Sequence, residues 1–111
     1  MEGRKSDNDK LRYDLIPVFA LQETVRVLNY GAHKYGPDNW RKVPDLRRRY
    51  VAAAMRHIEA YRMGERNDPE SALAHLAHAC SSLMFILEDH LNPEPPDVDL
   101  FNSQPNRYLY L

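Results

Sequence analysis

The sequence predicts an all-α fold, a small helical bundle, and two observations lead to this prediction. Apolar residues recur at helical spacing over residues 18–32 and 46–63, whereas no alternating apolar and polar run extends beyond four residues. In addition, residues 71–87 contain no Asp, Glu, Lys or Arg. A helix without charge over such a length is buried on most sides, as at the centre of a bundle.

The first two expected helices have clear boundary signals. The first starts at Pro17, whose missing N–H costs nothing in a first turn, and Gly31 and Gly36 bracket its end. The second runs from Leu46 to Met63 and stops at Gly64. The apolar stripe of the first is Val18, Leu21, Val25, Leu28 and Ala32, and that of the second is Tyr50, Ala54, His57 and Tyr61.

The third expected helix begins at Pro69, with Asp68 as its N-cap, and includes the uncharged residues 71–87. At 100° per residue, His75 and His78 lie nearly opposite its apolar stripe and are predicted to lie inside the bundle. Cys80, on the stripe, is interpreted as a small core hydrophobe. The stripe consists of Leu73, Leu76, Cys80, Leu83 and Leu87.

The 111 residues predict a single domain. Residues 1–10 are a polar lead-in expected to be flexible, and residues 11–91 form the helical core. Residues 92–111 hold four of the eight prolines and are expected to form an irregular arm, whose apolar end packs on its own subunit or on a neighbour. A core this small covers its surface poorly, so a homo-oligomer, a dimer or tetramer, is expected.

Composition excludes several classes of protein. The net charge of −1 gives no general attraction to nucleic acid or membranes, and no stretch approaches the ~20 apolar residues of a membrane span. The polar N-terminus lacks a secretory signal, and the single Cys80 excludes an intrachain disulfide and a cysteine-based zinc site. We therefore expect a cytoplasmic protein, in the host cytoplasm if a phage encodes it.

Charge is unevenly distributed along the chain. Residues 41–66 carry eight bases against three acids, whereas residues 67–103 carry seven acids and no base. Such a pair of segments suits a site that joins a polyanionic substrate to metal ions. Equally, the two segments could simply pair with each other, within one chain or across an oligomer interface.

The strongest candidates for chemistry are histidines. His75 and His78 share one helix face, and His57 could meet them in an antiparallel hairpin, within reach of one metal ion or anionic ligand. Alternatively, the three only fill the core and bond backbone carbonyls or a Tyr. Glu65 and Asp68 lie near the same hairpin end and would suit Mg²⁺, with Asp68 also capping its helix. Glu70 is expected to project to the far side, and Glu59 to pair with Arg62 or Arg66.

A loop rich in turn residues follows the first helix and contains Asn39 and Trp40. The indole could stack on a base, the amide could read its edge, and Lys34 could hold phosphates. The alternative, favoured by composition alone, is that Trp40 anchors the loop onto the core.

Several short motifs resemble those of the phage dATP/dGTP diphosphohydrolase family, which includes MazZ-type enzymes and is related to MazG. Their order along residues 8–90 matches, and Ala72 stands where a Gly is expected, a change without obvious cost. The wider MazG-like pattern places two ExxE/ExxD pairs on facing helices, where this chain has histidines. The motifs are Gly31-Ala-His-Lys-Tyr-Gly36, Asn39-Trp40, Tyr50, Arg56-His57, Gly64-Glu65, Asp68-Pro-Glu-Ser71 and His75-Leu-Ala-His-Ala79.

The resemblance implies an oligomer of the all-α NTP pyrophosphatase type. Such an enzyme hydrolyses dGTP or dATP to the monophosphate and pyrophosphate with Mg²⁺ or Mn²⁺. In phages that replace adenine by 2-aminoadenine, it would supply dGMP and remove dATP.

For such an enzyme, we expect Glu65 and Asp68 to bind the metal ion. We expect the catalytic residues to be His57, Glu65, His75 and His78. Substrate contacts are expected from Lys34, Asn39, Trp40 and Arg56. The alternatives are a phage protein that binds nucleic acid through residues 47–49 and a structural oligomerisation protein; no stable nucleic-acid partner is expected of the enzyme.

Overall fold

The computed structural model describes residues 2–93, and the all-α prediction is confirmed there. Three α-helices and two 3-10 helices, η1 (Tyr13–Leu15) and η2 (Asn39–Lys42), account for its regular structure, with a single isolated β-bridge between Asn67 and Ala74. Among these helices, none is long and apolar enough to cross a membrane. Apart from its first two residues, the predicted arm lies outside the described part of the chain.

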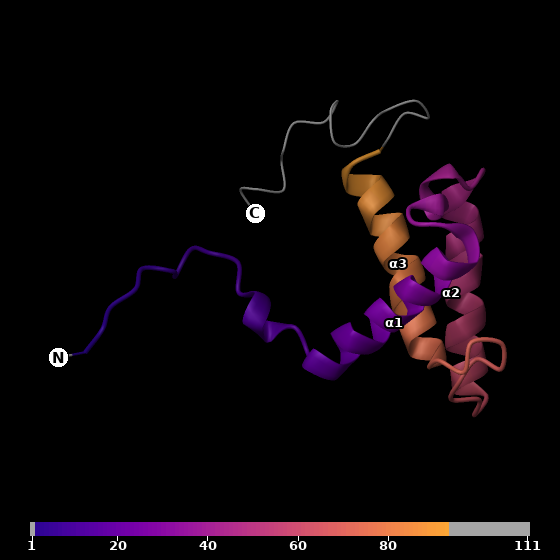
Figure 1. The fold of residues 1–111 in the computed structure, drawn as a ribbon, viewed down its shortest axis with the longest axis horizontal. Coiled ribbons are helices and arrows are strands. Elements are labelled where there is room, and N and C mark those ends of the chain that lie inside the picture. The colour runs from indigo at the N-terminus through magenta and orange to yellow at the C-terminus, as the bar shows by residue number, and fades with distance from the viewer. Residues whose placement is uncertain (1, 94–111) are drawn as a thin grey trace.

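Helix α1 (Val18–Tyr35) starts directly after Pro17 and ends at Gly36, as predicted, although it passes through Gly31 without interruption. Gly36 has a φ of 94°, a left-handed conformation that favours glycine and ends the helix. The N-terminal half of α1 projects away from the other two helices (Figure 1), and its first residues are exposed. Packing is confined to the second half, where Thr24 and Val27 are buried.

Helices α2 (Leu46–Arg62) and α3 (His75–Leu91) form an antiparallel hairpin that packs along most of its length (Figure 1). The predicted stop of α2 at Gly64 is confirmed by its φ of 104°. Small side chains fill the interface, since Ala54, Ala77 and Ala79 are the buried apolar residues of the pair. Small residues let two helix backbones approach closely, so the hairpin is a rigid frame for side chains at its ends.

The predicted start of the third helix is wrong. Residues 63–74 form a folded loop, Ala74 occupies the N-cap position of α3, and Asp68 and Pro69 lie in a turn of this loop. The Asp68 carboxylate accepts the backbone N–H of Ser71 at 2.9 Å, and the Asp68 N–H donates to the carbonyl of Leu73 at 2.7 Å. An Asp-Pro sequence suits a turn as well as a helix start, and the turn prevails here.

The backbone at Ala72 is not helical. Its φ of 63° lies in the left-handed region, which is costly for a residue with a Cβ. The expectation that Ala in place of Gly carries no obvious cost is therefore wrong, because glycine adopts this conformation freely.

The face of α3 that packs within the chain is also not the one expected. The small and polar residues are buried, whereas Leu83 is 52% exposed and Cys80 is exposed, so the prediction of Cys80 as a core residue is wrong for one chain. We call the exposed row the leucine stripe, and it comprises Leu76, Cys80, Leu83 and Leu87. Periodicity identifies an apolar face but not what covers it.

Candidate functional site: a histidine and carboxylate cluster

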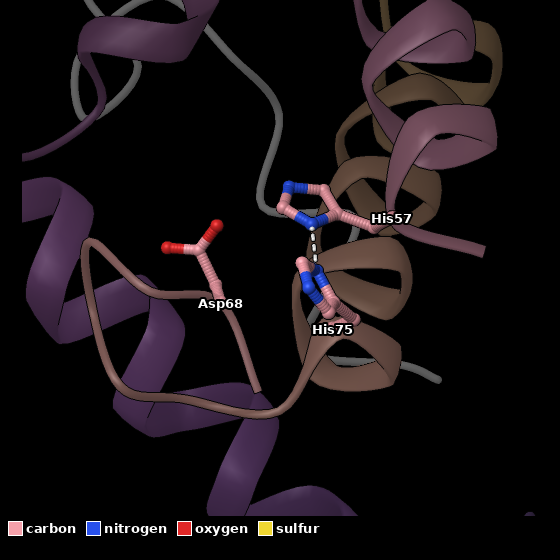
Figure 2. A group of neighbouring side chains, drawn as sticks. All are labelled: His57, Asp68 and His75. Atoms are coloured by element: carbon pink, nitrogen blue, oxygen red, sulfur yellow. Dashed lines mark hydrogen bonds between the residues drawn. The ribbon is translucent and has the colours of Figure 1, made fainter. Parts of the chain in front are cut away.

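Three side chains from separate segments meet where α2 faces the start of α3 (Figure 2). His57 extends from α2, His75 is the first residue of α3, and Asp68 comes from the loop between them. One nitrogen of each imidazole and one carboxylate oxygen all lie within 4.8 Å of one another. His75 is 4% exposed, and the other two are half-buried. These three groups could share one metal ion.

The two imidazoles face each other through the same kind of nitrogen. Nδ1 of His57 lies 2.8 Å from Nδ1 of His75 (Figure 2). On its other side, Nε2 of His75 lies 2.6 Å from Oε1 of Glu65. A carboxylate oxygen accepts hydrogen bonds, so His75 donates through Nε2–H, and a neutral His75 then has a bare Nδ1. Glu65 thus selects the tautomer that turns a lone pair of His75 toward His57.

His78 forms a second layer beneath the cluster. Its ring stacks on His57 with centroids 4.6 Å apart and an interplanar angle of 11°, and Tyr30 of α1 meets it edge-on at 6.3 Å. Its Nε2 lies 2.7 Å from Oγ of Ser71. Because the N–H of Ser71 also binds Asp68, this serine links the carboxylate to the second histidine of α3.

The surroundings set the charges of these groups. Burial lowers the pKa of His57, and the neighbouring His78 and His75 lower it further. Burial lowers the pKa of His78 as well. For Asp68, burial alone would raise the pKa, but the hydrogen bonds from the N–H and hydroxyl of Ser71 outweigh it, so the pKa falls below its usual value. At neutral pH His57 and His78 are therefore neutral and Asp68 is ionised, which are the states in which these side chains bind metal ions.

The chain matches the sequence profile described as "dATP/dGTP diphosphohydrolase, N-terminal" over residues 1–98. It belongs to this family. It is also 38% identical over 86 residues to a curated protein of Salmonella phage PMBT28 named "dATP/dGTP diphosphohydrolase". That alignment covers 78% of this chain but 29% of the phage protein, so the chain spans under a third of its relative's length. No solved structure matches the chain.

In this member of the dATP/dGTP diphosphohydrolase N-terminal family, the predicted convergence of His57, His75 and His78 is present in the structure. Glu65 is close by, but it contacts the far nitrogen of His75 and is not part of the group that can share one ion. Asp68 does belong to that group. The catalytic and metal-binding roles predicted for these residues remain predictions.

Of the predicted substrate contacts, Lys34 and Arg56 belong to segments that also carry or contact cluster residues. Lys34, in the last turn of α1, forms an ion pair with Glu70, which follows Asp68 in the same turn. Hydrogen bonding to Glu70 raises the pKa of Lys34, so its ammonium stays charged. Arg56 precedes His57 on α2 and is exposed. Glu59 pairs with Arg62 at 3.0 Å, as expected, and takes no part in the cluster.

Asn39 and Trp40 lie in η2, which packs on the other half of α3. The indole stacks on Phe85 with centroids 4.6 Å apart and an interplanar angle of 12°, and the Arg41 guanidinium lies 4.4 Å from the indole centroid. Phe85 follows His75 by ten residues, which is about 15 Å along a helix. These contacts are the ones expected if Trp40 anchors its loop onto the core. Stacking of Trp40 on a nucleotide base remains a prediction.

Two contributors to the cluster were not assigned a role from the sequence. Ser71 belongs to the family motif and was expected on the helix face of His75 and His78, whereas no sequence pattern marks Tyr30. The spacing of seven residues between Ser71 and His78, two helical turns, put both on one face of the predicted helix. That spacing was a correct signal for proximity, although Ser71 reaches His78 from a turn. A hollow of about 850 Å³ has no cluster residue in its lining, although several of its lining residues flank Glu65 and His75 in sequence; they are Tyr61, Arg62, Gly64, Arg66, Ala74 and Leu76.

Proposed function

We propose that this chain carries the catalytic site of a metal-dependent nucleotide diphosphohydrolase, which converts dGTP or dATP to the monophosphate and pyrophosphate. One observation carries the proposal: His57, Asp68 and His75 meet within 4.8 Å of one another in a chain of this family. Two imidazoles and a carboxylate within reach of one another are a common donor set for a metal ion, whereas histidines that only fill a core need no carboxylate beside them.

The donor set fits a divalent ion, because it combines imidazole nitrogen with an anionic oxygen. His57, Asp68 and His75 would hold the ion, which would supply charge neutralisation at the phosphate oxygens. Lys34 would bind phosphate through a charge that Glu70 holds in place. Arg56 is exposed and adjacent, and it would bind a second phosphate group.

His78 is the residue suited to accept a proton in this site. Burial lowers its pKa, so it is neutral at pH 7, and the Ser71 hydroxyl fixes one of its nitrogens. In the proposed step, a water oxygen attacks the α-phosphorus and the water gives its proton to His78. The bond from the α-phosphorus to the bridging oxygen breaks, and pyrophosphate leaves with the electron pair.

The chain would act in phage purine deoxynucleotide metabolism, where 2-aminoadenine replaces adenine and dATP has to be removed. The test is to incubate the full chain with dGTP or dATP and with Mg²⁺ or Mn²⁺, then to separate the products. Pyrophosphate and monophosphate are expected. The variant His57→Asn should lose activity, while His33→Asn, which changes an exposed histidine of α1, should keep it. Tripolyphosphate with a deoxynucleoside would contradict the proposed bond cleavage.

We also infer that the chain assembles as a homo-oligomer. Within residues 2–93 no large side chain is fully buried, and Phe19 is 79% exposed on the projecting half of α1. The leucine stripe is free of charge, so a second copy of the same stripe would cover it without leaving an ion unpaired. Light scattering should give a multiple of the chain mass, and Leu87→Glu should lower it. A monomer with a cooperative unfolding transition would contradict this inference.

A further inference from the structure

We propose that His57, Asp68 and His75 form a site selective for a transition-metal ion of the Mn²⁺, Fe²⁺, Co²⁺ and Zn²⁺ group over Mg²⁺. The inference rests on the proposed function for the purpose of the site, but its test does not use the reaction. It departs from the carboxylate pair Glu65 and Asp68, which the sequence suggested for Mg²⁺.

The choice of donor atoms separates the two classes of ion. Mg²⁺ prefers oxygen ligands and keeps several waters, whereas imidazole nitrogen suits first-row transition ions. Two of the three donors here are nitrogens. Two histidines and one carboxylate also leave coordination positions open, as in catalytic sites with three protein ligands.

The spacing of the nitrogens also fits one ion. Two ligand atoms that are each ~2.1 Å from an ion and subtend a right angle lie about 3.0 Å apart. The Nδ1 atoms of His57 and His75 are 2.8 Å apart. In the metal-free chain a proton joins these nitrogens, and a cation can take its place.

Each of the three ligands has its own support. The Glu65 carboxylate holds the Nε2–H of His75, the arrangement by which an outer carboxylate orients a metal-binding histidine. The N–H of Ser71 holds Asp68, and the ring of His78 stacks on His57. Glu65 is therefore a positioning residue in this site rather than a direct ligand.

Direct binding measurements test the inference without substrate. The full chain is stripped with a chelator and titrated with Co²⁺, Zn²⁺, Mn²⁺ and Mg²⁺, using calorimetry for all four and the visible absorption of Co²⁺ for its coordination. One Co²⁺ or Zn²⁺ per chain is expected, with a Kd roughly 100-fold or more below that of Mg²⁺. Equal affinity for Mg²⁺ and Co²⁺ would overturn the selectivity.

Variants test the ligand set. His57→Asn and Asp68→Asn should abolish the Co²⁺ spectrum, and Asn at position 68 can still accept the Ser71 N–H, so that variant should fold. Glu65→Gln should keep one ion per chain but weaken binding by about 10- to 100-fold. The exposed His33→Asn and His90→Asn are matched controls and should bind normally. An unchanged spectrum in both ligand variants would overturn the site.

The experiments can contradict the proposed reaction and the proposed metal selectivity independently of each other. Tight Co²⁺ or Zn²⁺ binding without pyrophosphate release under any metal would leave this inference standing and overturn the proposed function. Turnover with Mg²⁺, without tight binding of any transition ion, would support the proposed function and overturn this inference.

Discussion

The Glu65 carboxylate lies 2.6 Å from Nε2 of His75, while the other nitrogen of that ring faces His57. The side chain of His75 is 5% exposed and that of Glu65 is 53% exposed, so the pair joins a buried donor to a solvated acceptor. This pair fixes the orientation of the buried ring at the junction of the loop and α3.

The first prediction concerns this pair. Glu65→Leu should destabilise the fold by about 1–3 kcal/mol, because it leaves a buried N–H without its acceptor. Glu65→Gln should cost less, since its amide oxygen still accepts the same hydrogen bond. Urea unfolding of the two variants measures the difference. Equal stability of the two would show that water satisfies His75 instead.

The second prediction concerns Ala72, whose φ is 63°. Ala72→Gly should stabilise the chain by up to about 1 kcal/mol, because relief of a left-handed alanine outweighs the greater entropy of glycine in the unfolded chain. The control is Ala53→Gly in the middle of α2, which should destabilise by roughly 1 kcal/mol. Thermal unfolding of both variants checks the opposite signs.

The third prediction concerns Trp40, the single tryptophan of the chain. Trp40→Ala and Phe85→Ala should each lower stability, with a coupling of about 0.5–1.5 kcal/mol in a double-mutant cycle, because the rings stack. If Trp40 also stacks on the base, Trp40→Ala should raise KM about tenfold. If stability falls but KM is unchanged, Trp40 only anchors its loop onto the core and does not contact the base.

The fourth prediction concerns pH. Hydrogen bonding to Lys34, and then to Tyr30, lowers the pKa of the Glu70 carboxyl. A carboxyl with a lowered pKa in the folded state contributes stability above its unfolded pKa and loses it as the pH falls. Glu70→Gln should therefore lower Tm slightly at pH 7, and the difference should shrink as the pH falls and vanish once Glu70 is protonated in the folded chain. The effect should be small and sensitive to salt, because the pair is exposed. A difference in Tm that stays the same as the pH falls would contradict the ion pair as its cause.

The sequence predicted those features that depend on local chemistry. Pro17, Gly36 and Gly64 mark helix ends by their own backbone preferences, and helical spacing placed His57 opposite His75 and His78. The start of α3 could not be predicted, because Asp-Pro suits a turn and a helix start alike. The contact of Glu65 with the outer nitrogen of His75 depends on the path of an irregular loop, which no periodicity describes.

The last prediction concerns Asp68, which combines a backbone contact with a charge. Asp68→Asn keeps an oxygen that accepts the Ser71 N–H, so the loop should fold and the free energy of unfolding should change by less than about 1 kcal/mol. The loss of an anionic oxygen beside His57 and His75 should nevertheless lower turnover by roughly a hundredfold or more. Steady-state pyrophosphate release and urea unfolding separate the two effects. Ser71→Gly is the complementary variant, because it removes the hydroxyl bonded to His78 and leaves the carboxylate in place. If Asp68→Asn retains normal turnover, the charge of Asp68 has no part in the reaction and the catalytic site lies outside this cluster.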